Sequence, residues 1–319
     1  MVEARSWLES TKKRGMALGL KGTKTVLDRL QLTNPSHIIH VAGSNGKGTV
    51  CALIAAALSL NDIENVLFTS PHVARIEERI RRNGIPISSQ EFDAALEKIY
   101  HAAVGDSFNP AIELTFFEVT YLVSMIASVG SDVLILETGL GGRLDATRCG
   151  PATASLVTSV SREHVDILGS NLPSIAQEKV AIARPNCPIV IRDPEEDNVR
   201  RAMLREIQNA GNATLDETPA PAQALFVPIP KDSTVKEEAE ILASALFECI
   251  GFSTETIDQA KQILQWPARM QLLTKQETST HPYLLDAAHN SSGMLRILPE
   301  LERYIFQHAP QKNGQPVWT

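Results

Sequence analysis

Residues His37–Leu60 read HIIHVAGSNGKGTVCALIAAALSL and predict a buried strand, a glycine-rich turn and a helix in immediate succession. His37–Val41 is short and apolar, as is typical of a strand inside a parallel sheet. Gly48–Leu60 is apolar over a length that suits a helix. Glycines between the two allow backbone N–H groups to turn toward phosphate oxygens, and the helix N-terminus adds a favourable dipole. The stretch therefore predicts a phosphate-binding loop.

The polar side chains of this loop fit a bound nucleotide. Lys47 brings a mobile positive charge, and Thr49 brings a hydroxyl for a metal ion. The spacing departs from the GxxxxGK[ST] pattern, because Val41 stands where its first glycine belongs and Gly48 separates Lys47 from Thr49. A glycine-rich turn with an incidental lysine is the alternative explanation. The residues that we expect to bind ATP here are Asn45, Gly46, Lys47, Gly48 and Thr49.

Strand-like and helix-like segments alternate along the rest of the chain. This alternation predicts an α/β fold with a doubly wound, mainly parallel sheet. The further strands are expected at Val66–Phe68, Val133–Leu136, Ala154–Val160 and Pro188–Ile191. The further helices are expected at Ser89–Val104, Phe116–Ser128, Ser174–Ala183 and Glu195–Asn209.

The last third of the chain predicts the start of a second α/β unit. Glu217–Asp232 is rich in proline and is expected to be irregular, with helices following at Lys236–Cys249 and Thr254–Leu264. Pro267 then prevents further helix. We expect an ATP-binding domain over 1–266 and part of a second, Rossmann-like domain over 267–319, cut short and too small to enclose a full core. Its partly exposed side chains should be Leu284, Leu285, Leu295, Leu298 and Leu301.

Composition indicates a globular protein and disfavours several classes of partner. The 319 residues are 43% hydrophobic and 21% charged. A net charge of −7 disfavours nucleic acid as a partner. The four cysteines are scattered, without the paired spacing of a zinc site or a disulfide frame. Met1–Leu20 carries no continuous apolar run. We expect a cytoplasmic protein, a monomer, with no membrane partner.

Three further motifs carry chemistry. Residues 136–147 read LETGLGGRLDAT and place Glu137 at the end of a strand, where α/β sheets hold ligands. Ser70, after the preceding strand in the sheet, offers an oxygen of the kind that Mg²⁺ prefers. Residues 115–118 read TFFE, and aromatic faces beside a carboxylate suit a flat heterocycle. Core packing of the two phenylalanines is the alternative for this last motif.

These motifs, taken together, resemble those of the folylpolyglutamate synthase/dihydrofolate synthase family, which is related to the Mur ligases. The family pattern HVAGTNGKG[ST] is similar to residues 40–49. The other matching stretches, in chain order, are SPH at 70–72, ERI at 78–80, TFFE at 115–118, LGGRLDAT at 140–147, SREHVDILG at 161–169, QEK at 177–179, WPARMQ at 266–271 and DAAHN at 286–290.

The resemblance implies roles for individual residues. It implies a Mg²⁺ site at Ser70, Glu137 and His164, and a Lys179 that is carbamylated in relatives. The nucleotide contacts that it adds are Glu238, Arg269 and Asp286. The residues expected at the folate-side pocket are Thr115, Phe116, Phe117, Glu118, Leu144, Asp145 and Ala146. The residues expected to act in catalysis are Lys47, Lys179 and His289, the last as a base.

The implied reaction is ATP-dependent joining of L-glutamate to the carboxylate of a folate or dihydropteroate, through an acyl phosphate, and either acceptor remains open. The chain departs from the family pattern at five positions, namely Arg148, Glu163, Glu238, Ala268 and Ser291, where relatives have Asn, Asp, Asn, Gly and Pro. These departures keep open a non-catalytic nucleotide-binding remnant. A Mur-type ligase of cell-wall precursors is a second alternative, which the SPH, ERI and LGGRLDAT motifs disfavour.

Overall fold

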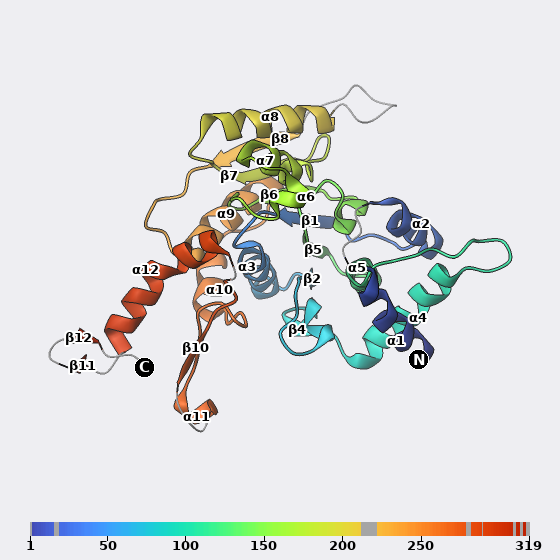
Figure 1. The fold of residues 1–319 in the computed structure, drawn as a ribbon, viewed down its shortest axis with the longest axis horizontal. Helices are drawn as coiled ribbons and strands as arrows, with labels where there is room; N and C mark the ends of the chain where they lie inside the picture. Colours follow the sequence, from blue (N-terminus) through green and yellow to red (C-terminus); the bar gives the residue numbers. More distant parts are fainter. Residues whose placement is uncertain are drawn as a thin grey trace.

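An eight-stranded sheet forms the centre of the computed structural model, in the order β4-β3-β2-β5-β1-β6-β7-β8 (Figure 1). The structure describes residues 2–15, 19–211, 222–278, 282–288, 290–308, 311–312 and 315–316. The strands are β1 (His37–Ala42), β2 (Asn65–Phe68), β3 (Ile80–Arg82), β4 (Ile85–Pro86), β5 (Val133–Glu137), β6 (Ala154–Val157), β7 (Pro188–Arg192) and β8 (Gln223–Val227). Strands β2, β5, β1, β6, β7 and β8 run parallel, and β3 and β4 are antiparallel. The predicted mainly parallel α/β fold is confirmed.

Helices cover both faces of this sheet because alternate strand residues point to opposite sides. Ile39 and Ile135 face α3 (Lys47–Leu60), α9 (Val235–Ile250) and α10 (Ile257–Ile263). Ile38 and Leu134 face the opposite layer. That layer contains α1 (Val2–Thr11), α2 (Lys21–Leu30), α4 (Ser89–Val104), α5 (Phe116–Ala127), α7 (Leu172–Val180) and α8 (Asp197–Gly211). Short turns of helix connect these elements: η1 (Lys12–Arg14), η2 (Ile76–Arg79), η3 (Ala146–Cys149) and α6 (Val165–Leu168).

Strand β8 corrects one prediction. Glu217–Asp232 was expected to be irregular, but Gln223–Val227 pairs in parallel with β7, from Pro188↔Gln223 to Arg192↔Val227. Strand β8 lies at the edge of the sheet. Proline has no backbone N–H to donate, but prolines that flank an edge strand do not remove any hydrogen bond between strands. The prediction was wrong because the apolar run ALFV between the prolines is itself the signal of a short strand.

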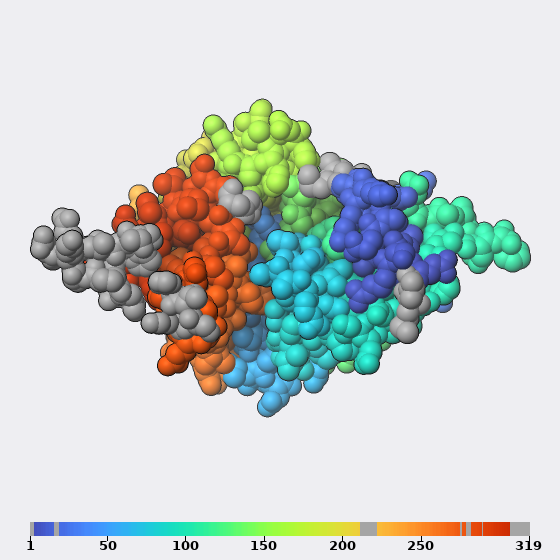
Figure 2. Space-filling model, turned by 60° about the horizontal axis from the view of Figure 1, so that its bottom comes forward, coloured from blue at the N-terminus to red at the C-terminus, as the bar shows by residue number. Residues whose placement is uncertain are grey.

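The C-terminal segment is smaller and less enclosed. Strand β9 (Gln271–Leu273) pairs with β10 (Tyr283–Leu285), and α11 (Lys275–Thr278), α12 (Ser291–His308), β11 (Gln311–Lys312) and β12 (Gln315–Pro316) complete the segment. In Figure 2 it forms the orange and red side of the molecule, opposite the dark blue N-terminal helices. The predicted partial exposure of the leucines is confirmed: Leu295 is 68% and Leu298 43% exposed. None of the described helices is long and apolar enough to cross a bilayer.

Candidate active site

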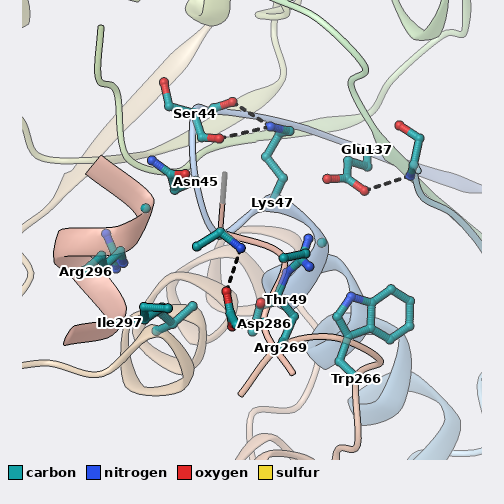
Figure 3. Close-up of a pocket in the computed structure, with 18 of the residues that line it drawn as sticks. Ser44, Asn45, Lys47, Thr49, Glu137, Trp266, Arg269, Asp286, Arg296 and Ile297 are labelled. Atoms are coloured by element: carbon teal, nitrogen blue, oxygen red, sulfur yellow. Dashed lines mark hydrogen bonds between the residues drawn. The ribbon is translucent and has the colours of Figure 1, made fainter. Parts of the chain in front are cut away.

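The turn between β1 and α3 holds its shape through glycines and one lysine. Gly43 and Gly46 have φ angles of 144° and 88°, which side chains rarely allow. A Cβ at Gly43 would lie 1.8 Å from Thr158 Oγ1, so no larger residue fits. Lys47 Nζ donates hydrogen bonds to the carbonyl oxygens of Gly43, at 2.9 Å, and Ser44, at 3.3 Å (Figure 3). The loop is therefore preformed, with a cation at its centre.

A cavity of about 240 Å³ opens on this loop. The ends of β2 and β5 form one wall, and residues between Leu264 and Glu300 form the facing wall. Most of the residues that the sequence singled out for nucleotide, metal and catalysis line this cavity together. They are Asn45, Gly46, Lys47, Gly48, Thr49, Ser70, Glu137, His164, Lys179, Arg269 and Asp286.

Glu137 is a buried carboxylate at the end of β5, only 5% exposed. One of its oxygens accepts a hydrogen bond from the Ser70 backbone N–H at 3.1 Å. Burial raises the pKa of Glu137, and the positive charge of Lys47 opposes that shift. A Cβ at Gly48 would lie 3.3 Å from Trp266 Nε1 and 3.6 Å from the Glu137 carboxylate. The glycine between Lys47 and Thr49 thus leaves room for both groups.

The oxygens around Glu137 fit a hard divalent cation. Thr49 Oγ1 is buried at the cavity and has no hydrogen-bond partner among the described residues. The described part of the chain contains no cluster of three His, Cys, Asp or Glu side chains that could hold a metal by themselves. Mg²⁺ commonly takes one or two protein oxygens and completes its shell with water and phosphate. Thr49, Glu137 and Ser70 suit that mode, and His164 lies at the exposed start of α6 on the same cavity.

Lys179 supports the phosphate loop from beneath. It lies on α7 and is 1% exposed. Its Nζ donates to the Gly43 carbonyl oxygen at 3.1 Å and lies 2.5 Å from Glu163 Oε1. Burial and the nearby charge of Lys47 lower the pKa of Lys179 to about 8. Burial would raise the pKa of Glu163, but the charge and hydrogen bond of Lys179 outweigh it and lower that pKa.

The C-terminal segment reaches the loop through its turns. The Asp286 carboxylate accepts hydrogen bonds from the backbone N–H groups of Met270, at 2.9 Å, and Ala288, at 2.7 Å. These bonds hold the turn that carries Arg269 against the cavity. Asn45 contacts Asn290 at 3.3 Å and Ser292 at 3.4 Å, where α12 begins. Two distant parts of the chain therefore enclose the cavity.

Glu238 has a different environment from the one expected of a nucleotide contact. The side chain is 2% exposed and forms ion pairs with Arg192, at 3.0 Å, and with Arg296 of α12. Both arginines approach the same oxygen, Oε2. The other oxygen, Oε1, lies 4.0 Å from the position of a Cβ on Gly46. Glu238 thus ties α12 to α9 and β7, and its contact with a nucleotide stays a prediction.

The residues expected at the folate-side pocket form a layer beside the cavity. Thr115 and Glu118 make a capping box at the start of α5, and Thr23 donates to Glu118 Oε1 at 2.6 Å. The Phe117 ring packs against Gly139 and stands 5.6 Å from the Phe68 ring. The Arg79 guanidinium lies over the other aromatic ring of this layer, that of Phe116, at 5.2 Å.

The neighbouring residues 144–146 differ in exposure. Asp145 is buried and accepts hydrogen bonds from the backbone of Gly139, Leu140 and Thr147. Ala146 is buried, whereas Leu144 is 41% exposed. The carboxylates of Glu118 and Asp145 are therefore engaged in holding loops in place, whereas Leu144 is exposed and the half-buried Phe117 ring packs against the core.

Several residues that the sequence did not single out also line the cavity. His289, the expected base, lies outside the described residues. Sequence reasoning did not identify Arg296, Ile297 and Glu300, which line the cavity from α12. Their spacing places them on one face of a helix, but only knowledge of what that face meets could have singled them out.

No family model matches the chain. A curated relative, the dihydrofolate synthase/folylpolyglutamate synthase of Haemophilus influenzae, is 36% identical over 65% of this chain and 46% of its own length. The Escherichia coli protein of the same name is 29% identical over 94% of this chain and 74% of its own length. The chain is thus similar, over most of its length, to proteins named dihydrofolate synthase/folylpolyglutamate synthase.

Solved structures of this family agree with the fold across nearly the whole chain. A crystal structure of a bifunctional folylpolyglutamate synthase/dihydrofolate synthase with Mn, AMPPNP and L-glutamate bound has a TM-score of 0.78 at 28% identity, covering 96% of this chain and 76% of that one. A structure of E. coli FolC in complex with DHPP and ADP has a TM-score of 0.75 at 26% identity, covering 97% and 75%. The chain thus spans from under half to about three quarters of the length of these family members.

Proposed function

We propose that the protein is an ATP-dependent ligase that joins L-glutamate to the carboxylate of a folate or dihydropteroate. One observation carries the proposal: a single cavity unites the preformed loop around Lys47, the buried carboxylate Glu137 and the Arg269–Asp286 turn. Family members with AMPPNP, Mn and L-glutamate bound, or with DHPP and ADP bound, support the choice of ligands.

The first step is transfer of the γ-phosphoryl group of ATP to an oxygen of the acceptor carboxylate. The bond between the γ-phosphorus and the bridging oxygen breaks, ADP leaves, and an acyl phosphate forms. Such a transfer depends on in-line positioning and on neutralised phosphate oxygens. The N–H groups of residues 45–49 and the ammonium of Lys47 serve this purpose, and Arg269 adds charge from the opposite wall.

The second step forms the amide. The amino group of glutamate, once it has lost a proton, attacks the activated carbonyl carbon, and phosphate leaves. His289 is our candidate for the base, because it follows Asp286–Ala288 at the cavity wall in the sequence. The enclosing C-terminal turn keeps water from the acyl phosphate, which would otherwise hydrolyse.

A divalent cation supplies Lewis-acid stabilisation of phosphate oxygens when bound. Thr49, Ser70, Glu137 and His164 are the residues that we propose hold it. Lys179 keeps the loop in position. Its pKa of about 8 leaves part of the amine neutral near neutral pH, which is the form that carbamylation requires. The Glu163 carboxylate would then have to move away from Nζ.

The acceptor binds, in this proposal, beside the cavity at the layer of 115–118 and 144–146. The Phe117 ring and the exposed Leu144 offer apolar contacts for a flat heterocycle. Dihydropteroate and tetrahydrofolate both carry a pterin ring system, at different reduction levels, so both are included. The four free cysteines fit our proposal that the protein works in the cytoplasm.

The decisive experiment is phosphate release with ATP, Mg²⁺ and L-glutamate, with dihydropteroate in one arm and tetrahydrofolate in the other. We expect release that depends on both the acceptor and glutamate, together with a product heavier by one glutamyl residue. Tight ATP binding without release in either arm would favour a nucleotide-binding protein that has lost the ligase activity. The involvement of Glu238 in two ion pairs is the observation that supports this second candidate.

A further inference from the structure

One end of the cavity differs in character from the end that holds phosphate. Val235, Leu264 and Ile297 contribute apolar lining to the cavity, and Ile297 lies next to Arg296 on α12. Figure 3 shows Arg296 and Ile297 on α12, on the opposite side of the cavity from Glu137 and Trp266. Because the loop and Glu137 mark the phosphate end, the apolar end is where the base of a bound nucleotide belongs.

Arg296 brings donors to this apolar end. Its side chain is 17% exposed and lines the cavity. One terminal nitrogen donates to the buried carboxylate of Glu238, which also holds Arg192. The Nε–H is buried without a partner among the described residues. A buried donor without a partner is destabilising, so a ligand acceptor at this position is favoured.

Glu300 brings an acceptor to the same end. It lies one helical turn after Arg296 and also lines the cavity. Within the described part of the chain, no hydrogen bond or ion pair reaches its carboxylate. The positive charges of Lys236 and Arg303 lie farther away, and that of Lys236 has the larger electrostatic effect on this carboxylate. Burial raises the pKa of this carboxyl group. A half-buried carboxylate in such a setting is suited to accept from a ligand N–H.

We propose that Arg296 and Glu300 recognise the purine base of the nucleotide, with Glu238 as the residue that positions the Arg296 guanidinium. The inference rests on the proposed function, since it assumes that the phosphate end holds a triphosphate. The adenine base carries an exocyclic amino group as donor, next to ring nitrogens that accept. Glu300 accepts from the amino group, and Arg296 donates to a neighbouring ring nitrogen. Helix α12 thereby recognises the base, whereas the loop before α3 binds the phosphates.

The test compares three ligands by calorimetry, each with Mg²⁺: ATP, purine riboside triphosphate, which lacks the amino group, and inorganic tripolyphosphate, which lacks the nucleoside. Arg296→Ala and Glu300→Ala are each expected to weaken ATP binding about tenfold, the size of one lost base contact. Neither change should alter tripolyphosphate binding. Glu300→Ala should also abolish the preference of the wild-type chain for ATP over purine riboside triphosphate.

Matched controls separate base recognition from damage to the fold. Glu302→Ala, on the same helix and exposed, and Arg205→Ala, on the exposed face of α8, should leave all three affinities unchanged. Arg296→Lys keeps a charge beside Glu238 but loses the planar donors, and should still weaken ATP binding. Unchanged ATP affinity in the Arg296 and Glu300 variants, or an equal loss for tripolyphosphate, would overturn the inference.

The outcomes also distinguish this inference from the proposed function. Base-dependent loss of ATP binding without phosphate release in any substrate arm would leave base recognition standing and remove the ligase activity. Phosphate release that persists, together with unaltered ATP affinity in both variants, would leave the ligase activity standing and overturn base recognition. Failure of the wild-type chain to bind either ATP or tripolyphosphate would overturn both.

Discussion

Glu163 and Lys179 form a buried ion pair directly beneath the phosphate loop, with Glu163 Oε1 2.5 Å from Lys179 Nζ. The same ammonium donates to the carbonyl oxygen of Gly43, the residue that begins the loop. The Lys179 ammonium, itself paired with Glu163, therefore holds one carbonyl group of the loop from outside it. The pair also makes the stability of the fold depend on pH in a calculable direction.

The pH dependence follows from the lowered pKa of Lys179. Its value falls from 10.5 to about 8 on folding, so between these limits the unfolded chain binds the extra proton and stability rises with pH. Relative to the double variant Lys179→Met/Glu163→Gln, the wild-type chain should gain about 1 kcal/mol of unfolding free energy between pH 7 and pH 9. Urea denaturation at the two pH values measures the difference, and parallel pH profiles would contradict the assignment.

Lys47→Ala tests the loop. The side chain is only half-buried and donates to loop carbonyls, so the fold should persist. Phosphate release should fall by about 100-fold or more, as expected when a charged group that stabilises the transition state is removed. The thermal midpoint should stay within a few degrees of the wild type. Lys98→Ala, an exposed lysine on α4, is the control and should leave turnover unchanged. Normal phosphate release by Lys47→Ala would reject the assignment of this loop.

Glu137→Gln tests the cation site. The change keeps the shape and the hydrogen bond to the Ser70 N–H but removes the charge. We expect the Mg²⁺ concentration for half-maximal phosphate release to rise at least about tenfold. Because burial already disfavours the ionised form, the neutral variant should be no less stable to urea than the wild type. An unchanged Mg²⁺ requirement, with the exposed Glu195→Gln as reference, would show that Glu137 is not a ligand.

Ala268→Gly tests the turn before Arg269. Ala268 has a φ of 53°, a left-handed conformation that costs a residue with a Cβ about 1–2 kcal/mol. Glycine removes that cost but loses about 0.4–1 kcal/mol through a freer unfolded chain. The substitution should therefore be neutral or stabilising by up to about 1 kcal/mol in urea denaturation. Ala94→Gly, at an exposed position within α4, should instead destabilise by about 1 kcal/mol. Equal destabilisation by both changes would argue against strain at Ala268.

Several elements were predictable because their signals are local. The strand at His37–Val41 and the helix after Lys47 were expected within one residue of their bounds, since apolar periodicity and glycine placement act over a few neighbours. Glu137 was singled out for the same reason, by its place at a strand end before glycines. Strand β8 was not predicted because the prolines on either side of its short apolar run indicated irregular structure. Prolines are compatible with that position because β8 lies at the edge of the sheet.

The sequence by itself determined the parallel sheet, the loop between β1 and α3, and the charged residues Lys47 and Glu137 beside that loop. Each of these features depends on residues within one strand–turn–helix unit. Only the tertiary structure decided that Lys179, 136 residues from Gly43, is buried beneath the loop rather than solvated on a helix surface. It alone also brought Ser292 of α12 to Asn45, 247 residues away, and placed Arg296 and Glu300 in the cavity. Contacts at such separations depend on the path of the whole chain through the sheet and on the total of its packing, which no local spacing encodes.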